Sequence, residues 1–160
     1  MTMGMNTNTN VSGSGPKKMP KKLSNEELKL MAESGYSKKA IDLYVNKVNM
    51  GPLENASVIT TFLGQCGDLI RLYLQISNRD KIENASFYYL GCPGSAASAS
   101  AMTTLLKGMT VKQAKQLTED NIVKELGGLP KSKSDCATLS IKTLRKAIAE
   151  YERQKGRSEI

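Results

Sequence analysis

The change of hydrophobic period between residues 57 and 90 constrains the fold of this chain more than any other feature. Residues 57–63 are rich in β-branched side chains, and residues 69–77 alternate apolar and polar side chains, as strands do. Residues 82–90 repeat this alternation after a turn-forming segment, residues 78–81. Because the connections between the three strands are short, we expect a three-stranded antiparallel sheet.

Helical patterns flank the predicted strands. Ser24 followed by Glu27 is a capping box, which predicts a helix to about residue 34, and a second helix is expected at residues 37–47. After the strands, we expect a helix at residues 95–107, a second beginning near residue 110, a third at residues 118–126 and a long last helix at residues 136–154. The fold class is therefore α+β, with a three-stranded antiparallel sheet packed by C-terminal helices and one or two N-terminal helices.

The chain length and the charge distribution indicate a single domain with a tail. Residues 1–22 hold four lysines, no acidic residue and few bulky apolar side chains, which predicts a disordered basic tail. Residues 23–156 then form the single domain. The net charge is +8, but no aromatic residue lies among the tail lysines. We therefore expect a solvated tail rather than a nucleic-acid-binding arm.

The chain contains no histidine and three cysteines. The first fact excludes histidine-based catalytic triads, histidine general acids or bases, and histidine metal ligands. The odd number of cysteines argues against a disulfide framework and favours a reducing, cytoplasmic setting. No segment approaches the roughly 18 apolar residues of a membrane helix, and no apolar signal peptide is present.

Each cysteine lies in a setting that suits metal binding. Cys66 and Asp68 flank Gly67, and side chains two apart in an extended segment point the same way. Cys92 and Cys136 each stand at a predicted helix start, where free N–H groups and a partial positive charge favour the thiolate. Three thiolates and one carboxylate make four donors, the number that a tetrahedral zinc ion or a [2Fe–2S] cluster requires.

Other interpretations of these residues stay open at this point. Free cysteines are among the most buried residues and often only fill space. The spacings of 26 residues (66 to 92) and 44 residues (92 to 136) are not a CxxC pattern, so spacing alone does not establish a metal site. Asp68 could instead be a turn residue whose carboxylate accepts a hydrogen bond from a nearby backbone N–H.

An ordered set of motifs resembles the IscU/NifU family of iron–sulfur cluster assembly scaffold proteins, over residues 36–152. The motifs are residues 66–68 (Cys-Gly-Asp), 91–98 (Gly-Cys-Pro-Gly-Ser-Ala-Ala-Ser), 105–108 (Leu-Leu-Lys-Gly), 126–130 (Leu-Gly-Gly-Leu-Pro) and 133–136 (Lys-Ser-Asp-Cys). The resemblance implies a scaffold or carrier protein rather than an enzyme.

The resemblance also implies a ligand set. Cys66, Asp68, Cys92 and Cys136 would bind iron in a nascent [2Fe–2S] cluster, with zinc as the alternative metal. A hard carboxylate on iron is more exchangeable than a fourth thiolate, so Asp68 would keep the cluster labile. Cys136 would accept persulfide sulfur, and Lys133 would assist by favouring its thiolate.

The partners that the resemblance implies are a cysteine desulfurase, apo iron–sulfur proteins and a frataxin-like iron donor. A homodimer stays open, and neither nucleic acid nor a membrane is expected as a partner. The segment that Hsp70-type chaperones recognise in the family departs from its pattern at residues 129–133 (Leu-Pro-Lys-Ser-Lys), which argues against such a chaperone. Asp135 stands where the family usually has histidine. It could be a further metal ligand, although we favour a helix cap.

A second branch of the family gives the alternative function. SufU proteins bind zinc at the same three cysteines and aspartate and relay persulfide sulfur from a cysteine desulfurase. Residues 136–140 (Cys-Ala-Thr-Leu-Ser) resemble that branch, which also lacks the histidine. SufU proteins, however, carry an insertion between the second and third cysteines, and the 44 residues from 92 to 136 are too few for it. We therefore place the scaffold first.

Overall fold

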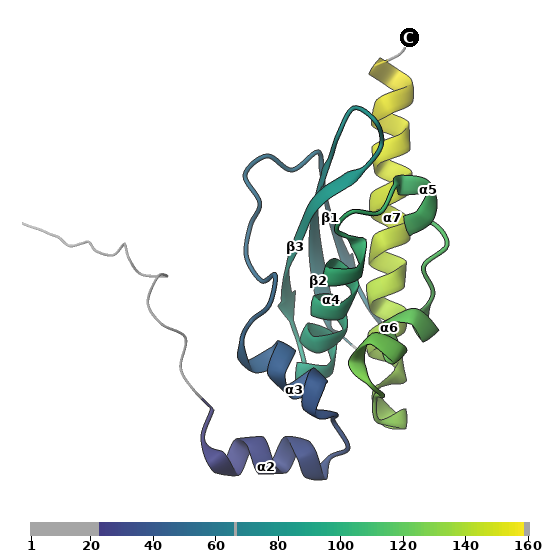
Figure 1. Ribbon diagram of the computed structural model, residues 1–160. Coiled ribbons are helices and arrows are strands. Elements are labelled where there is room, and N and C mark those ends of the chain that lie inside the picture. Colours follow the sequence, from purple (N-terminus) through teal and green to yellow (C-terminus); the bar gives the residue numbers. More distant parts are fainter. Residues whose placement is uncertain (1–22, 66, 159–160) are drawn as a thin grey trace, which may run out of the picture.

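A three-stranded antiparallel sheet lies at the centre of the fold in the computed structural model, which describes residues 23–65 and 67–158 (Figure 1). The strands are β1 (Val58–Leu63), β2 (Leu69–Ile76) and β3 (Ile82–Leu90), in that spatial order. The sequence predicted each strand to within one residue at either end. Ile70, Leu72 and Leu74 are fully buried, as their alternation along β2 requires.

The strand register brings three chain segments to one end of the sheet, where β1 and β3 end and β2 begins; we call this end the ligand edge of the sheet. Leu63 pairs with Leu69 across β1 and β2, and Leu69 pairs with Leu90 across β2 and β3. The end of β1, the start of β2 and the end of β3 therefore lie side by side. The loop of residues 64–68 and the segment after Leu90 leave the sheet at the ligand edge.

The helices begin where the sequence places their caps. They are α2 (Asn25–Glu33), α3 (Lys38–Val45), α4 (Pro93–Leu106), α5 (Val111–Ala114), α6 (Glu119–Leu126) and α7 (Ser134–Ser158), with a short 3-10 helix, η3 (Lys131–Lys133), before α7. Ser24 forms the capping box predicted from the sequence, and Thr110 forms a second one at the start of α5. These contacts satisfy backbone N–H groups that the first helical turn leaves free. The α+β class with two N-terminal helices is confirmed.

The start of α7 differs from the expectation. Neither Ser134 nor Asp135 caps the helix, because α7 already begins at Ser134. The chain enters α7 through η3, in which the Lys133 N–H donates to the Pro130 carbonyl at 2.8 Å. The predicted capping role of Asp135 is therefore wrong, and Asp135 is the second residue of the helix.

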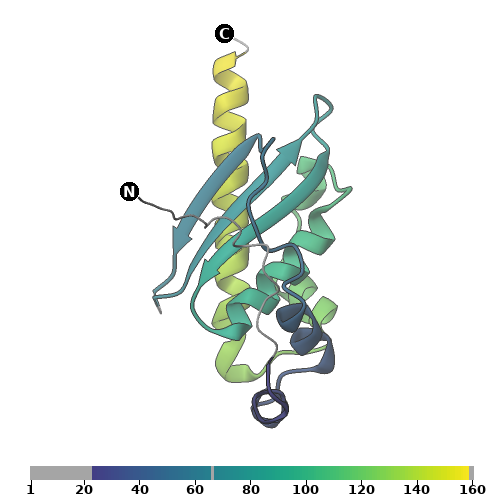
Figure 2. The ribbon, with the colours of Figure 1, turned by 90° about the vertical axis from the view of Figure 1, so that its left-hand side faces the viewer.

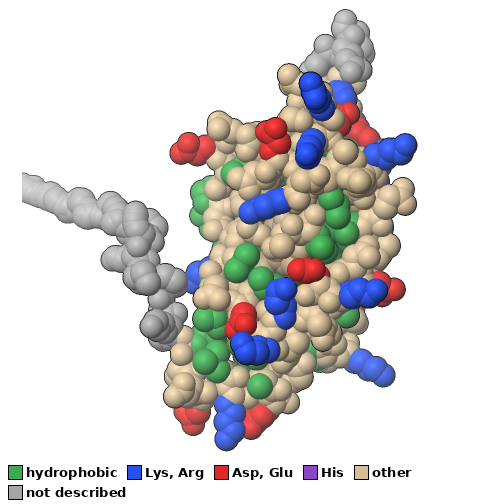
Figure 3. Space-filling view, in the orientation of Figure 1, with side chains coloured by type: hydrophobic (Ala, Val, Ile, Leu, Met, Phe, Trp, Pro, Cys, Tyr) green, Lys and Arg blue, Asp and Glu red, His purple; other side chains and the backbone are tan. Residues whose placement is uncertain are grey.

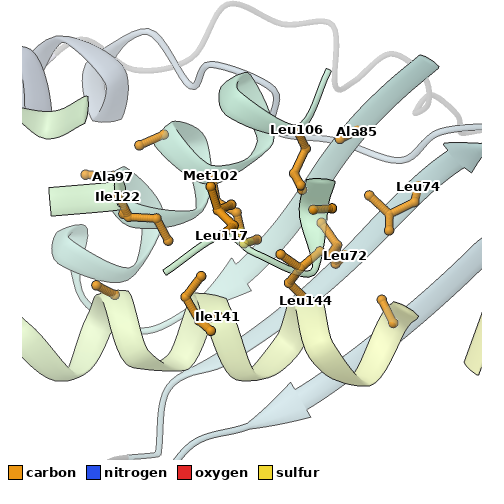
Figure 4. Packing of buried hydrophobic residues seen from close by; sticks show 14 of the residues in the cluster. Leu72, Leu74, Ala85, Ala97, Met102, Leu106, Leu117, Ile122, Ile141 and Leu144 are labelled. Atoms are coloured by element: carbon orange, nitrogen blue, oxygen red, sulfur yellow. The ribbon is translucent and has the colours of Figure 1, made fainter. Parts of the chain in front are cut away.

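The helices α4 and α7 cover one face of the sheet. Helix α4 packs on β3, and α7 packs on β1 and β2, so both lie behind the sheet in Figure 2. Small buried side chains on α4, including Ala97 and Ala101, allow α4 to lie close to α7. Fully buried side chains from the sheet, α4, α6 and α7 meet between these layers (Figure 4): Leu72, Met102, Leu106, Ile122 and Ile141.

The face of the molecule drawn in Figure 3 carries basic side chains interspersed with acidic ones, rather than one basic patch. The predicted basic tail, residues 1–22, lies outside the described residues. None of the helices in the described part of the chain has the length and apolar character that a membrane crossing needs.

Candidate metal centre

Three chain segments meet at the ligand edge of the sheet and bring three potential ligands together. Asp68 comes from the loop between β1 and β2, Cys92 from the start of α4, and Cys136 from the first turn of α7. One ligand atom from each lies within 4.8 Å of the other two. Cys66, the fourth predicted ligand, lies outside the described residues, so its place in this group stays a prediction.

The local sequence explains how Cys92 reaches this point. Pro93 occupies the first position of α4, which leaves Cys92 as the N-cap with an extended backbone. Besides Cys136, the Ser95 backbone N–H lowers the pKa of Cys92, but the thiol makes no side-chain cap on the helix. The sulfur instead lies 3.6 Å from the Cys136 sulfur.

The two sulfurs affect each other's protonation. A hydrogen bond with Cys136 lowers the pKa of Cys92, and it outweighs the opposing effect of burial. The same hydrogen bond, together with burial, raises the pKa of Cys136. The contact therefore favours the thiolate at Cys92 over the thiolate at Cys136.

Asp68 is held at the start of α4 by hydrogen bonds. The Ser95 hydroxyl donates to Asp68 Oδ2 at 2.6 Å, and the Cys92 N–H donates to the same oxygen at 3.3 Å. Burial pushes the pKa of Asp68 upward, but these hydrogen bonds and the positive charge of Lys133 outweigh it and hold the pKa below its usual value. Asp68 is therefore an anion beside the two sulfurs.

Two glycines, Gly91 and Gly94, make room for the ligands because they carry no side chain. A Cβ atom on Gly91 would stand 2.3 Å from Asp68 Cγ, and the φ angle of Gly91 is 146°. A Cβ atom on Gly94 would stand 2.9 Å from the Cys136 sulfur and 3.1 Å from the Tyr36 hydroxyl. Side chains at either position would displace a proposed ligand.

No sequence pattern indicated that Tyr36 belongs to this site. Tyr36 lies between α2 and α3, and the backbone of Gly94 lies against its buried hydroxyl, but the hydroxyl proton has no acceptor in the described part of the chain. Burial and the nearby Cys92 and Cys136 side chains raise the pKa of Tyr36 to about 12. The hydroxyl therefore stays protonated and is a free donor next to the sulfurs. Only the tertiary structure brings it there.

The two remaining predicted site residues lie around the group rather than in it. Lys133 is close enough for its charge to act on Asp68. Asp135 is exposed and lines a cavity of about 230 Å³ with Gln65, Thr138 and Lys142. Asp135 is absent from the three described residues whose ligand atoms converge. Its role as a metal ligand therefore stays a prediction without geometric support.

The described donors fit a metal or an iron–sulfur cluster. Soft sulfur and hard oxygen ligands converge from three segments, the glycines clear the space, and the unpartnered Tyr36 hydroxyl points to a missing acceptor. Zinc and iron both accept this mixture of ligands. A fully apolar filling role for Cys92 does not agree with its partial exposure and lowered pKa.

Comparison with known proteins agrees with this geometry. The iron–sulfur cluster assembly scaffold protein IscU 1 of Archaeoglobus fulgidus is 37% identical over 123 residues, covering 76% of this chain and 80% of that protein. The iron sulfur cluster assembly protein 2, mitochondrial, of Saccharomyces cerevisiae is 34% identical and covers 86% of this chain and 91% of its own length.

A solved structure shows the same fold. The putative iron–sulfur cluster assembly scaffold protein for the SUF system from Fervidobacterium islandicum is 26% identical, with a TM-score of 0.61, and the match covers 71% of this chain and 96% of that one. The family described as the NifU-like N terminal domain matches residues 35–158. The family match and the similar relatives show that the chain belongs to the IscU/NifU family of scaffold proteins, and the fold and the converging ligands agree with this.

Proposed function

We propose that this protein is a scaffold for iron–sulfur cluster assembly. It receives sulfur and iron, builds a labile [2Fe–2S] cluster on Cys66, Asp68, Cys92 and Cys136, and transfers the cluster to apo-proteins. The observation that carries this proposal is the convergence of the Asp68, Cys92 and Cys136 ligand atoms within 4.8 Å. Relatives that are named as scaffold proteins support it.

The mixture of ligands suits temporary binding. Soft thiolates hold iron firmly, whereas a carboxylate is a harder and more exchangeable ligand. Hydrogen bonds from the Ser95 hydroxyl and the Cys92 N–H hold Asp68 Oδ2, so the carboxylate would bind iron through a single oxygen. Asp68 is therefore the ligand that an acceptor protein's thiolate would displace first.

Sulfur would arrive from the persulfide of a cysteine desulfurase. A thiolate of this protein attacks the outer sulfur of that persulfide, a new S–S bond forms, and the desulfurase cysteine leaves as a thiolate. The family resemblance implies Cys136 as the acceptor, but the lowered pKa favours the thiolate at Cys92, and Cys136 is more deeply buried. If Cys136 accepts the sulfur, its proton must first pass to Cys92, 3.6 Å away.

The exposed apolar side chains beside the site suit a partner protein. Leu63 and Leu90 are 64% and 68% exposed and flank Leu69 across the strands, at the ligand edge of the sheet. A desulfurase or an apo-protein must approach this edge to reach the sulfurs. The frataxin-like iron donor, the homodimer and the cytoplasmic location stay predictions, and one relative is named as mitochondrial.

The alternative is a SufU-like protein that binds zinc and relays sulfur. The match to a SUF-system scaffold protein and the aspartate in place of the family histidine favour it. In that function, the same four residues hold zinc, and the sulfur leaves as a persulfide rather than in a cluster. The two functions therefore differ in the resting metal and not in the residues that bind it.

Anaerobic reconstitution with iron and sulfide separates the two functions. The scaffold is expected to develop the absorption spectrum of a [2Fe–2S] cluster. Replacing Cys66, Cys92 or Cys136 with Ser is expected to abolish this spectrum, because each removes a thiolate ligand. Metal analysis of the purified protein is the parallel measurement. Tightly bound zinc, with no cluster formed even after the zinc is removed, would contradict the scaffold and support the sulfur relay.

Replacing Asp68 with Cys tests the temporary nature of binding. A fourth thiolate holds iron more firmly than a carboxylate, so transfer of the cluster to an apo-ferredoxin is expected to slow at least several-fold. Transfer is followed by the spectrum of the acceptor protein. Asp42→Cys, which adds a thiol at an exposed position of α3, is the matched control and should transfer at the wild-type rate. Equal or faster transfer from Asp68→Cys would show that the Asp68 carboxylate is not what makes cluster binding temporary.

Alkylation of the metal-free protein tests the difference between the sulfurs. Only the thiolate reacts, so Cys92 is expected to react with iodoacetamide faster than Cys136 at neutral pH. As the pH is lowered, the alkylation rate of Cys92 should begin to fall only well below about 8.5, the pKa of an ordinary thiol. In Cys136→Ala, which removes the hydrogen-bond donor, the Cys92 profile should shift to higher pH. Mass spectrometry of the labelled peptides measures both rates, and preferential labelling of Cys136 would contradict the assignment.

A further inference from the structure

Ser95 makes the shortest hydrogen bond at the site. It lies three residues after Cys92 in the first turn of α4, and it is fully buried. Its hydroxyl has one proton, and that proton is directed at Asp68 Oδ2 over 2.6 Å. A hydrogen bond from a neutral hydroxyl to a carboxylate at this distance is charge-assisted and strong. Ser95 is therefore tied to Asp68 rather than free to turn toward Cys92, whose sulfur is 3.9 Å away.

The rest of the surroundings fix the same carboxylate. The Cys92 N–H reaches Oδ2 at 3.3 Å, and the backbone of Gly91 lies against the carboxylate on a side where any Cβ would collide with it. The hydrogen bonds from the Ser95 hydroxyl and the Cys92 N–H both reach Oδ2, whereas the Cys92 side chain is the further neighbour of the carboxylate. The carboxylate is thus held by one oxygen, and the second oxygen is left for a ligand role.

We propose that Ser95 is a positioning residue that orients Asp68 as a single-oxygen metal ligand. The inference rests on the proposed function, because it assumes that Asp68 binds metal. By fixing Oδ2, Ser95 orders the Asp68 side chain in advance. Metal binding then costs less conformational entropy. Hydrogen-bond partners that orient a ligand in this way typically contribute about 10–100-fold to metal affinity.

A second serine on the same helix provides the matched control. Ser98 lies one turn further along α4, is equally buried, and its hydroxyl has no partner in the described part of the chain. Replacing Ser98 with Ala removes a buried hydroxyl from α4 without touching Asp68. Alanine is also a better helix former than serine, so both Ser95→Ala and Ser98→Ala are expected to fold. Thermal unfolding of the metal-free variants checks this.

Anaerobic titration with Co²⁺ measures the effect. Ser95→Ala is expected to bind Co²⁺ about 10–100-fold more weakly than wild type, and Ser98→Ala with unchanged affinity. The sulfur-to-cobalt charge-transfer band should keep its intensity in Ser95→Ala, because the thiolate ligands are unchanged. Only the d–d bands, which report the coordination geometry, should change.

A double-mutant cycle separates positioning from a purely structural role. If Ser95 acts only through Asp68, adding Ser95→Ala to Asp68→Ala causes no further loss of affinity. Additive losses, or wild-type affinity in Ser95→Ala, would overturn the inference while leaving the proposed function intact. Wild-type affinity in Asp68→Ala would instead contradict the ligand role of Asp68 itself, and both proposals would fail together.

Discussion

The convergence of two helix N-termini on the ligand edge of the sheet is the constraint on which the site depends. Helices α4 and α7 lie close together because α4 presents alanine and serine side chains at their contact. Their first turns then bring the Cys92 and Cys136 sulfurs to 3.6 Å. The free N–H groups and the positive ends of the helices stabilise negative charge there, before any metal is present. The protein can therefore keep a thiolate and a carboxylate side by side at a partly buried position.

Asp68 has the contacts of a turn residue and a position that suits a metal ligand, the two alternatives that the sequence left open. Its Oδ2 atom accepts the Cys92 N–H and the Ser95 hydroxyl, as a structural turn or cap residue would. The same carboxylate lies within reach of both sulfurs, as a metal ligand would. The two roles are compatible because a carboxylate has two oxygens. A carboxylate that the protein already holds by hydrogen bonds is well placed for a ligand role.

Local patterns explain which parts of this structure could be predicted. Alternation along β2, the capping boxes at Ser24 and Thr110, and Pro93 after Cys92 each act over a few residues, so the sequence alone places the strands, most helix starts and the Cys92 N-cap. Features that depend on tertiary contacts could not be predicted: the Tyr36 hydroxyl beside the sulfurs, the hydrogen bond from Ser95, and the start of α7 after η3. The raised pKa of Cys136 belongs to this group, because it follows from the distance to Cys92 and not from the position in the helix.

The most direct test of the account is the X-ray absorption spectrum of the zinc-loaded protein at the zinc edge. Zinc is suitable because it tolerates sulfur and oxygen ligands and takes no part in redox chemistry. The account predicts a shell of three sulfur atoms at about 2.3 Å and one oxygen atom at about 2.0–2.2 Å. In Asp68→Ala, the three sulfurs should remain. A shell with one sulfur or none would contradict the claim that the three cysteines and Asp68 form one metal site.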